Sequence, residues 1–276
     1  MSGRDRRLTP CNGRVAAEHL RGAVDAATFV VPDRAKVCAP VADLWREPGG
    51  VRDRQILFGD QVDVFEERAG FAFVQSIKDG YVGYVAQGCL GPVGADPTHW
   101  VAVQSSHAYP EPDMKVPEAY VLPFCAHVTV VSHLPGFFET DGGLYIPKPH
   151  LRPVDKRFKD PVTAAQLLFG APYLWGGNTS AGVDCSGLVQ LAWHAAGRDC
   201  PADSDMQETL GEIVEPKAQM QRGDLLFWRG HVALAVDDAT LIHANVHHMA
   251  VAYEPAEKAI RRIEAQGDGP VIGHRR

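Results

Sequence analysis

The sequence predicts a multidomain chain in which two small all-β barrels precede an α+β domain. The chain has 276 residues, which is enough for more than one hydrophobic core. From about residue 36 to 155, short alternating strands are separated by turns that contain glycine or proline, and this pattern repeats once. After residue 156, helical segments precede a run of apolar strands, an order typical of an α+β domain.

The first barrel is expected at residues 36–95 and the second at residues 96–155. In the first, Val62 and Val64 alternate with polar residues between turns that contain glycine. The stretches "HWVAVQSS" and "FCAHVTVV" begin a repeat of the same succession of strand, proline-containing loop, strand and glycine hairpin. Residues 1–35 are expected to contain a short helix in "GRVAAEHLRGAV" and to pack on the first barrel.

The α+β domain is expected at residues 156–276. In "PVTAAQLLFG", Thr163 lies in the expected cap region and Gly170 ends the helix. A second helix is expected in "CSGLVQLAWHAAG", ending at Gly197. The segment from "RGDLLFW" to "VAYEP" is expected to form successive strands with tight turns at "RG" and "DDAT".

Charge and cysteine content limit the possible partners and compartment. The formal net charge of −7 disfavours nucleic acid or an anionic membrane as the main partner. The N-terminus has no apolar run of signal-peptide length, so a cytoplasmic location is expected. The six cysteines are scattered without a CxxC pair, which suits a reducing compartment and makes structural disulfides the less favoured interpretation.

Neither a metal nor a cofactor is expected. "HANVHHMA" contains His243, His247 and His248, but no glutamate follows the first histidine as in zinc peptidases. "GDGPVIG" is rich in glycine but lacks the lysine and hydroxyl residue of a phosphate-binding loop.

Cys185 lies at the expected start of the second helix. Backbone N–H groups and the helix dipole favour negative charge at that position. Both effects lower the pKa of a thiol and increase the thiolate fraction, as a nucleophile requires. A lone cysteine before a helix is, however, more often a small buried hydrophobic residue.

Two histidines can complete a catalytic site around this thiol. His231 opens the apolar strand "HVALAV" and can act as the base, while His243 in "TLIHAN" can orient it from the neighbouring strand. Taken singly, His231 could instead cap a strand and His243 could be a hydrogen-bonded core residue. Their order relative to Cys185 favours the catalytic interpretation.

The motifs "PYLWGG", "DCSG", "GDLLF" and "HVALAV" resemble the NlpC/P60 family of cysteine peptidases over roughly residues 162–248. The upstream segments resemble bacterial SH3 (SH3b) domains. The most similar subgroup has two SH3b domains before the peptidase and includes the YkfC-like γ-D-glutamyl-L-diamino acid endopeptidases. The resemblance implies two SH3-like barrels followed by a papain-like NlpC/P60 domain.

The resemblance assigns Cys185 as nucleophile, His231 as base and His243 as the third polar residue. Tyr173 matches a tyrosine whose hydroxyl lies near the thiol and helps to hold the oxyanion, together with the backbone N–H of Cys185. Trp175 is expected in the wall of the pocket.

Asp184 and Ser186 match residues that hold the free α-amino group of the substrate in that subgroup. A carboxylate beside a thiol raises the pKa of the thiol, so binding an ammonium would explain its presence. The first SH3b domain of the subgroup also supplies an acidic residue and a tyrosine, for which Glu47 and either Tyr81 or Tyr84 are candidates. Tyr81 is favoured, although ordinary barrel packing also explains these aromatic residues.

The expected activity is hydrolysis of the bond between γ-D-Glu and a diamino acid, in murein peptides with a free N-terminal L-Ala. The expected partner is therefore a small peptide released during cell-wall recycling, L-Ala-γ-D-Glu-diamino acid. Two alternatives remain open at this point. One is a catalytically weak protein that binds wall fragments, and the other is an amidase or acyltransferase of the same superfamily.

Overall fold

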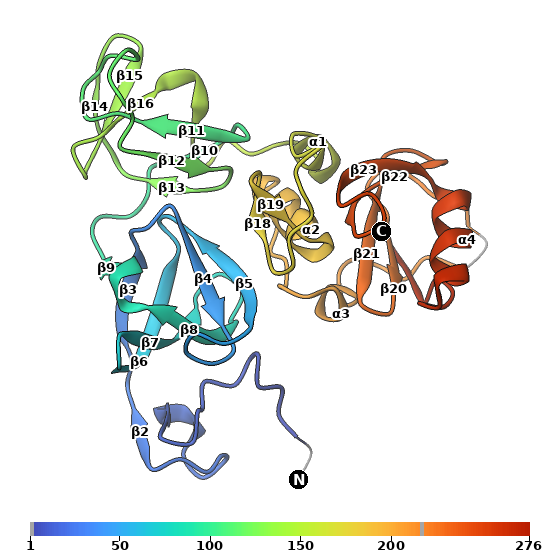
Figure 1. Ribbon diagram of the computed structural model, residues 1–276, viewed down its shortest axis with the longest axis horizontal. Coiled ribbons are helices and arrows are strands. Elements are labelled where there is room, and N and C mark those ends of the chain that lie inside the picture. Colours follow the sequence, from blue (N-terminus) through green and yellow to red (C-terminus); the bar gives the residue numbers. More distant parts are fainter. Residues whose placement is uncertain (1–2, 216–217) are drawn as a thin grey trace. The chain divides into compact units, whose positions relative to one another are not determined.

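The computed structural model describes residues 3–215 and 218–276, and the chain divides into two compact units. The N-terminal unit comprises the residues up to Val101 and Ser105–Val154, and the C-terminal unit comprises Ala102–Gln104 and Asp155–Arg276. Figure 1 colours the chain from blue at the N-terminus to red at the C-terminus. The border between the units lies one residue before the expected start of the α+β domain, and the finer four-part division stays a prediction.

The N-terminal segment forms strands rather than the expected helix. Strand β1 (Val15–Ala17) pairs in parallel with β2 (Thr28–Val30), and only the single 3-10 turn η1 (Glu18–Leu20) lies between them. The helix expected in "GRVAAEHLRGAV" is therefore wrong. Gly22, with φ of +79°, adopts a left-handed conformation that ends helical geometry, and pairing with β2 satisfies the backbone of β1 instead. Leu20 packs with Phe65 of the neighbouring sheet.

A seven-stranded antiparallel sheet follows, in the order β5-β4-β8-β7-β6-β3-β9. Its strands are β3 (Asp33–Val37), β4 (Val41–Trp45), β5 (Arg52–Leu57), β6 (Gln61–Arg68), β7 (Phe71–Ser76), β8 (Val82–Ala86) and β9 (Leu90–Pro92). The 3-10 turn η2 (Gln87–Cys89) precedes β9. Alternate residues such as Leu44, Ile56 and Val74 are fully buried, as the period of a strand with one face in a core requires. The first strand begins three residues before the expected border at residue 36.

The rest of this unit repeats the same pairing order with shorter strands. They are β10 (His99–Val101), β11 (Ser105–Ala108), β12 (Tyr120–Pro123), β13 (His127–Val128), β14 (Val130–His133), β15 (Phe137–Thr140), β16 (Tyr145–Pro147) and β17 (Leu151–Pro153). Strand β10 pairs with β13 and β17, as β3 pairs with β6 and β9. A 3-10 turn, η3 (Lys148–His150), again precedes the last strand. This shared order supports two related β-domains, and the identification of the second as SH3-like stays a prediction.

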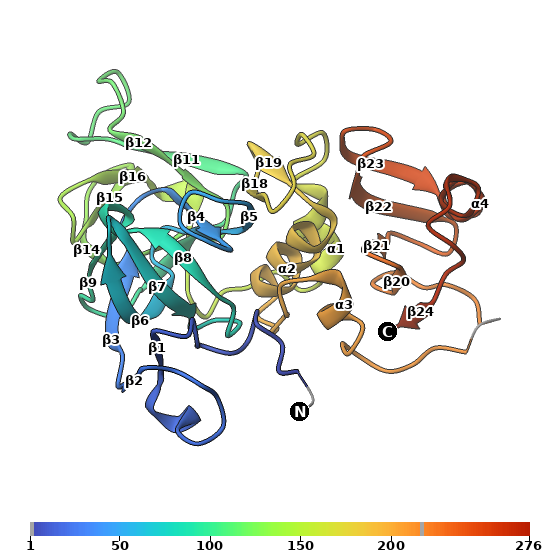
Figure 2. The same ribbon diagram turned by 60° about the horizontal axis from the view of Figure 1, so that its bottom comes forward.

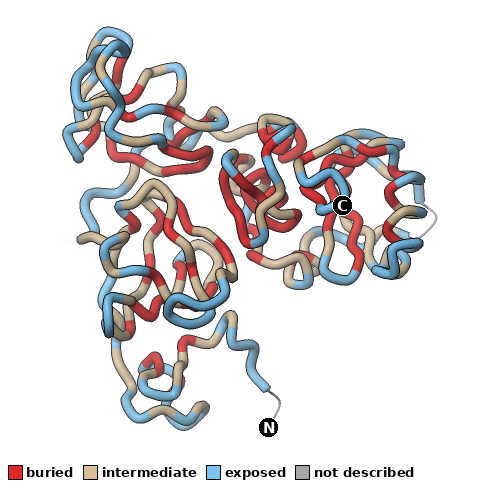
Figure 3. Tube along the Cα trace, viewed as in Figure 1, coloured by how far each residue is buried: buried red, intermediate tan, exposed pale blue. Residues whose placement is uncertain are grey.

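The C-terminal unit is an α+β domain built on a five-stranded antiparallel sheet in the order β23-β22-β21-β20-β24. The strands of the sheet are β20 (Leu225–Trp228), β21 (His231–Ala235), β22 (Thr240–Asn245), β23 (Ala250–Pro255) and β24 (Gly273–Arg275). The helices are α1 (Pro161–Gln166), α2 (Cys185–Ala195), α3 (Ser204–Gln207) and α4 (Ala256–Gln266), and the short hairpin β18 (Asn178–Thr179) and β19 (Gly182–Val183) precedes α2. Helices α2 and α4 flank the sheet (Figures 1 and 2). Figure 3 shows that α2 and the central strands form the buried interior.

Helix α1 begins one turn earlier than the sequence suggested. Asp160 is its N-cap, and the side chain accepts a hydrogen bond from the backbone N–H of Thr163 at 3.1 Å. Pro161 occupies the first helical position, where its missing N–H has no cost. Thr163 is therefore the third helical residue and donor to the cap rather than the cap itself. None of the helices in the described parts of the chain is long and apolar enough to cross a bilayer.

Gly59→Ala is expected to destabilise the N-terminal unit more than Gly70→Ala. Both glycines are left-handed, with φ of +86° and +82°, so each alanine costs about 1–2 kcal/mol. At Gly59 the new Cβ would also overlap the carbonyl oxygen of His127, whereas nothing lies within 4 Å at Gly70. This overlap should add ~1–3 kcal/mol to the loss of unfolding free energy, measured by calorimetry. Equal losses in the two variants would show that the contact does not matter.

Candidate active site

Cys185 is the first residue of α2, and its thiol lies next to the strand that carries His231. Its sulfur lies 4.0 Å from the carbonyl oxygen of Gly230. The backbone N–H groups of Ser186 and Val232 favour the thiolate and so tend to lower the pKa of this thiol. Cys185 is 7% exposed, so its reactivity depends on these protein groups more than on water.

The thiol does not have the lowered pKa that its place at a helix start suggested. Burial raises the pKa of Cys185 to about 12, and the neighbouring Asp184 carboxylate adds to the increase. The helix amides favour the thiolate, but they are outweighed because an almost fully buried anion loses its hydration. The free protein therefore holds a neutral thiol at pH 7.

His231 and His243 form a direct hydrogen-bonded pair on adjacent strands. His231 Nε2 lies 2.9 Å from His243 Nδ1, and the ring centroids are 5.2 Å apart. His231 opens β21 and His243 lies on β22, so the hairpin brings them together as expected. Burial lowers the pKa of His231 to about 3 and that of His243 to about 4, which keeps both rings neutral at pH 7.

Two further residues, not recognised from the sequence, extend this pair. Glu254 Oε2 lies 3.1 Å from His243 Nε2, and Arg262 Nη2 donates to the same oxygen at 2.7 Å. Burial opposes ionisation of Glu254, but hydrogen bonds from Arg262 hold the pKa of Glu254 below its ordinary value. The sequence "AVAYEP" is a strand pattern in which Glu254 shares a face with Ala252, and the observed register pairs Ala252 with His243.

Asp184 has a structural role that was not anticipated. Its Oδ1 accepts hydrogen bonds from the backbone N–H of Gly187 at 2.7 Å and from Ser186 Oγ at 3.1 Å. Its Oδ2 accepts from the backbone N–H of Gly176 at 2.9 Å. Asp184 thus caps α2 and fixes the preceding loop, which explains a carboxylate beside the thiol without any ligand. Its assignment to amine binding, with Ser186, stays a proposal.

Tyr173 and Trp175 lie at a cleft beside His231. The cleft has a volume of about 240 Å³. Its walls are formed by Tyr173, Trp175, Arg229, Gly230, His231, Asn245, Val246, Arg262, Ile263, Gln266 and Asp268. Burial raises the pKa of the Tyr173 hydroxyl, and Cys185 and Asp184 add to the increase. The backbone of Tyr173 forms a bridge with Val183, two residues before the thiol. Trp175 is 66% exposed and forms an apolar part of the wall.

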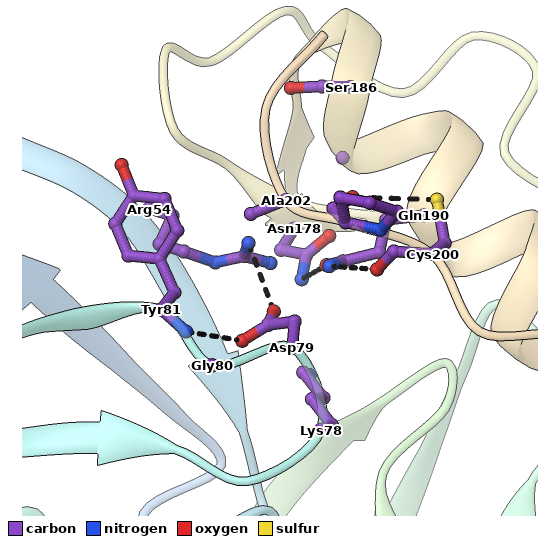
Figure 4. Close-up of polar contacts among 12 residues, drawn as sticks. Arg54, Lys78, Asp79, Gly80, Tyr81, Asn178, Ser186, Gln190, Cys200 and Ala202 are labelled. Atoms are coloured by element: carbon purple, nitrogen blue, oxygen red, sulfur yellow. Dashed lines mark hydrogen bonds and ion pairs between the residues drawn. The ribbon is translucent and has the colours of Figure 1, made fainter. Parts of the chain in front are cut away.

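The candidates from the first β-domain are described within their own unit. Tyr81 is 2% exposed. The Cζ atom of the Arg54 guanidinium lies over the Tyr81 ring, 5.4 Å from the ring centroid. Arg54 forms a buried ion pair with Asp79 at 3.1 Å (Figure 4). Glu47 is exposed in the turn after β4, and the Tyr84 ring packs 5.1 Å from that of Phe73. A role for Glu47 and Tyr81 in closing the site stays a prediction.

Within residues 3–215 and 218–276, no three His, Cys, Asp or Glu side chains are grouped as metal ligands. His247 and His248 lie in the turn after β22, and His248 Nδ1 lies 2.9 Å from Asn245 Oδ1. All six cysteines are free thiols in this structure.

The C-terminal unit therefore has a thiol at a helix N-terminus and a histidine pair on an antiparallel sheet. Residues 170–263 match the family model "NlpC/P60 family", and residues 44–90 match "Bacterial dipeptidyl-peptidase Sh3 domain". The chain combines an NlpC/P60 domain with a bacterial SH3 domain.

Several known proteins are similar to this chain. It is 28% identical over 214 residues to the gamma-D-glutamyl-L-lysine dipeptidyl-peptidase of Bacillus subtilis, covering 69% of this chain and 71% of that protein. A protein of the same name from Bacillus cereus is 33% identical over 93 residues, covering 31% of this chain and 28% of the relative. Dipeptidyl-peptidase 6 of Lysinibacillus sphaericus is 38% identical over 92 residues, covering 32% and 33%. The chain thus spans about a third or less of the last two relatives.

One solved structure shows the same fold over most of the chain. It is an NlpC/P60 family protein from Bacillus cereus, with a TM-score of 0.74 at 19% identity. The match covers 88% of this chain and 99% of that one.

Cys185 should react slowly with iodoacetamide at neutral pH and faster as the pH rises. Because burial raises its pKa, the thiolate fraction should grow about tenfold per pH unit between pH 7 and 9. Peptide mass spectrometry can follow the rate at each cysteine, with the exposed Cys38 as an internal control for the reagent. A Cys185 rate that is already constant below pH 8 would contradict a raised pKa.

Proposed function

We propose that this protein is a cysteine endopeptidase. It hydrolyses the bond between γ-D-Glu and a diamino acid in murein peptides that have a free N-terminal L-Ala. The observation that carries the proposal is the thiol of Cys185 beside the hydrogen-bonded pair His231 and His243, at the edge of a cleft. The names of the Bacillus subtilis and Bacillus cereus relatives support this choice of bond.

Because the Cys185 thiol and the His231 ring are both neutral in the free protein, the thiol proton moves to His231 during the attack. As Cys185 Sγ attacks the γ-carbonyl carbon of D-Glu, His231 takes the thiol proton. The backbone N–H of Cys185 and the Tyr173 hydroxyl donate to the oxyanion. His231 then gives its proton to the leaving α-amine, and a thioester remains. Water, with His231 again as base, attacks the thioester and restores the thiol.

The free amine of the substrate is assigned to Asp184 and Ser186. Asp184 is only partly buried, and its carboxylate directly precedes Cys185 at the start of α2, so an ammonium held there would lie beside the reacting thiol. An ammonium would also offset the negative charge that disfavours the thiolate of Cys185.

The leaving group occupies the cleft, because the amine that departs must receive its proton from His231. Arg229 and Asp268 are exposed in the wall of this cleft, and neither has a hydrogen-bond or ion-pair partner among the side chains described. A diamino acid brings a carboxylate beside the departing amine and an ammonium at the far end of its side chain. One free cation and one free anion suit this pair of charges.

A peptide with a free L-Ala amine exists only after the bond between the stem peptide and its glycan has been cut. An amidase-type reaction must therefore supply this substrate, which fits recycling of wall fragments. Recycling in the cytoplasm is part of the proposal, and cell fractionation would test that location.

Incubation with L-Ala-γ-D-Glu-L-Lys should release L-Ala-γ-D-Glu and lysine, detected by mass spectrometry, and Cys185→Ala should abolish the release. The N-acetylated tripeptide should show a kcat/KM about 10–100-fold lower, because it offers no charge-assisted hydrogen bond to Asp184. Asp184→Asn should reduce this preference for the free amine, and unfolding curves control for loss of the cap. No dipeptide from a folded protein with a reactive thiol would exclude the proposed activity.

Arg229→Ala should raise KM for the tripeptide about tenfold but leave KM for its C-terminal amide unchanged. The amide lacks the α-carboxylate that Arg229 is proposed to bind. The matched control is Arg261→Ala, on the exposed surface of α4 and outside the cleft. Equal effects on the acid and the amide would argue against carboxylate recognition.

A further inference from the structure

We infer that Glu254 is a positioning residue that sets the protonation pattern of both site histidines. The expected effect of Glu254 on catalysis rests on the proposed function. The hydrogen-bond pattern itself is a property of the free protein.

Glu254 presents a fixed acceptor to His243. Its side chain is 9% exposed, and Arg262 holds it through two hydrogen bonds, from Nε at 3.0 Å and from Nη2 at 2.7 Å. An ionised carboxylate can accept hydrogen bonds but cannot donate them. The contact of 3.1 Å between Glu254 Oε2 and His243 Nε2 therefore requires a proton on that ring nitrogen.

This requirement passes from one ring to the other. A neutral imidazole carries one proton, so His243 Nδ1 must be an acceptor. His231 Nε2 lies 2.9 Å from His243 Nδ1, so His231 Nε2 must carry the proton and donate this hydrogen bond. His231 Nδ1 is left without a proton, and it is the atom that can take the proton of Cys185. The Glu254 carboxylate, acting through His243, thus determines that Nδ1 is the basic nitrogen of His231.

Arg262 opposes the effect of the Glu254 charge on the two histidines. It raises the acidity of Glu254, and its positive charge also opposes protonation of His231 and His243. At His243 the effect of Glu254 exceeds that of Arg262, but burial outweighs both, so both histidines stay uncharged in the free protein. A salt bridge that only anchored α4 on the sheet would not need to face His243.

The direct test is nitrogen-15 NMR of the histidine side chains in the full chain, assigned with His231→Asn and His243→Asn variants. In the wild-type protein at pH 7, both His231 and His243 should carry the proton on Nε2 and have bare Nδ1 atoms. A proton on Nδ1 of either ring, or a cationic ring, would overturn the inference. This measurement needs no substrate, so it is independent of whether the tripeptide is cleaved.

Glu254→Gln provides the functional test, because an amide offers a donor as well as an acceptor and no longer forces a single pattern. We expect mixed tautomers by NMR and a kcat for the tripeptide about 10–100-fold lower, with KM changed less than twofold. Glu257→Gln, in the exposed first turn of α4, is the matched control and should change neither. Glu254→Asp retains a carboxylate and should recover part of kcat and the wild-type tautomers. Loss of kcat in Glu254→Gln with wild-type tautomers would reduce Glu254 to an anchor and overturn its positioning role.

Discussion

The start of helix α2 is the constraint on which the arrangement of the site depends. The carboxylate of Asp184 binds donors from both sides of the cysteine, and so fixes where the helix begins and which direction the thiol takes. Gly187 is required for the same geometry, because a Cβ there would lie 2.5 Å from the carbonyl oxygen of Gly177. Gln207 supports the turn from α3 by donating to the carbonyl of Ser186 at 2.9 Å. A helix that began one residue later would turn the thiol away from β21.

Burial then decides the charge state of the groups brought together. The thiol and both imidazoles lie in a region that disfavours any isolated charge, so their pKa values move away from neutrality in opposite directions. His243 contacts the carboxylate of Glu254, and Arg262 holds that carboxylate in an ion pair. Charge separation between Cys185 and His231 is therefore confined to the reaction itself, when the substrate has displaced water and offers hydrogen-bond donors and acceptors of its own.

The sequence predicted those parts of the structure that are determined locally. Helix α2, the placement of Cys185 and the hairpin that joins the histidines follow from short-range periodicity and turns. Glu254 was missed because its role depends on the register of β22 against β23, which pairs Leu241 with Glu254, and on a side chain from α4. The thiol pKa was misjudged because a helix terminus is visible in a sequence, whereas the burial that outweighs it is not. The parallel pairing of β1 with β2 was also beyond local propensity, since it joins residues thirteen positions apart.

The side chains of the site fall into two classes with different tolerance to change. Asp184, His243 and Glu254 each have hydrogen bonds that also hold secondary structure in place, so substitution affects folding and chemistry together. Arg229 and Asp268 are exposed and make no side-chain contact of that kind within the described residues. Their replacement removes little that the fold requires. Selectivity for the leaving group can therefore diverge among related chains through residues of the cleft wall, while the thiol and its two histidines remain under the constraint of the fold.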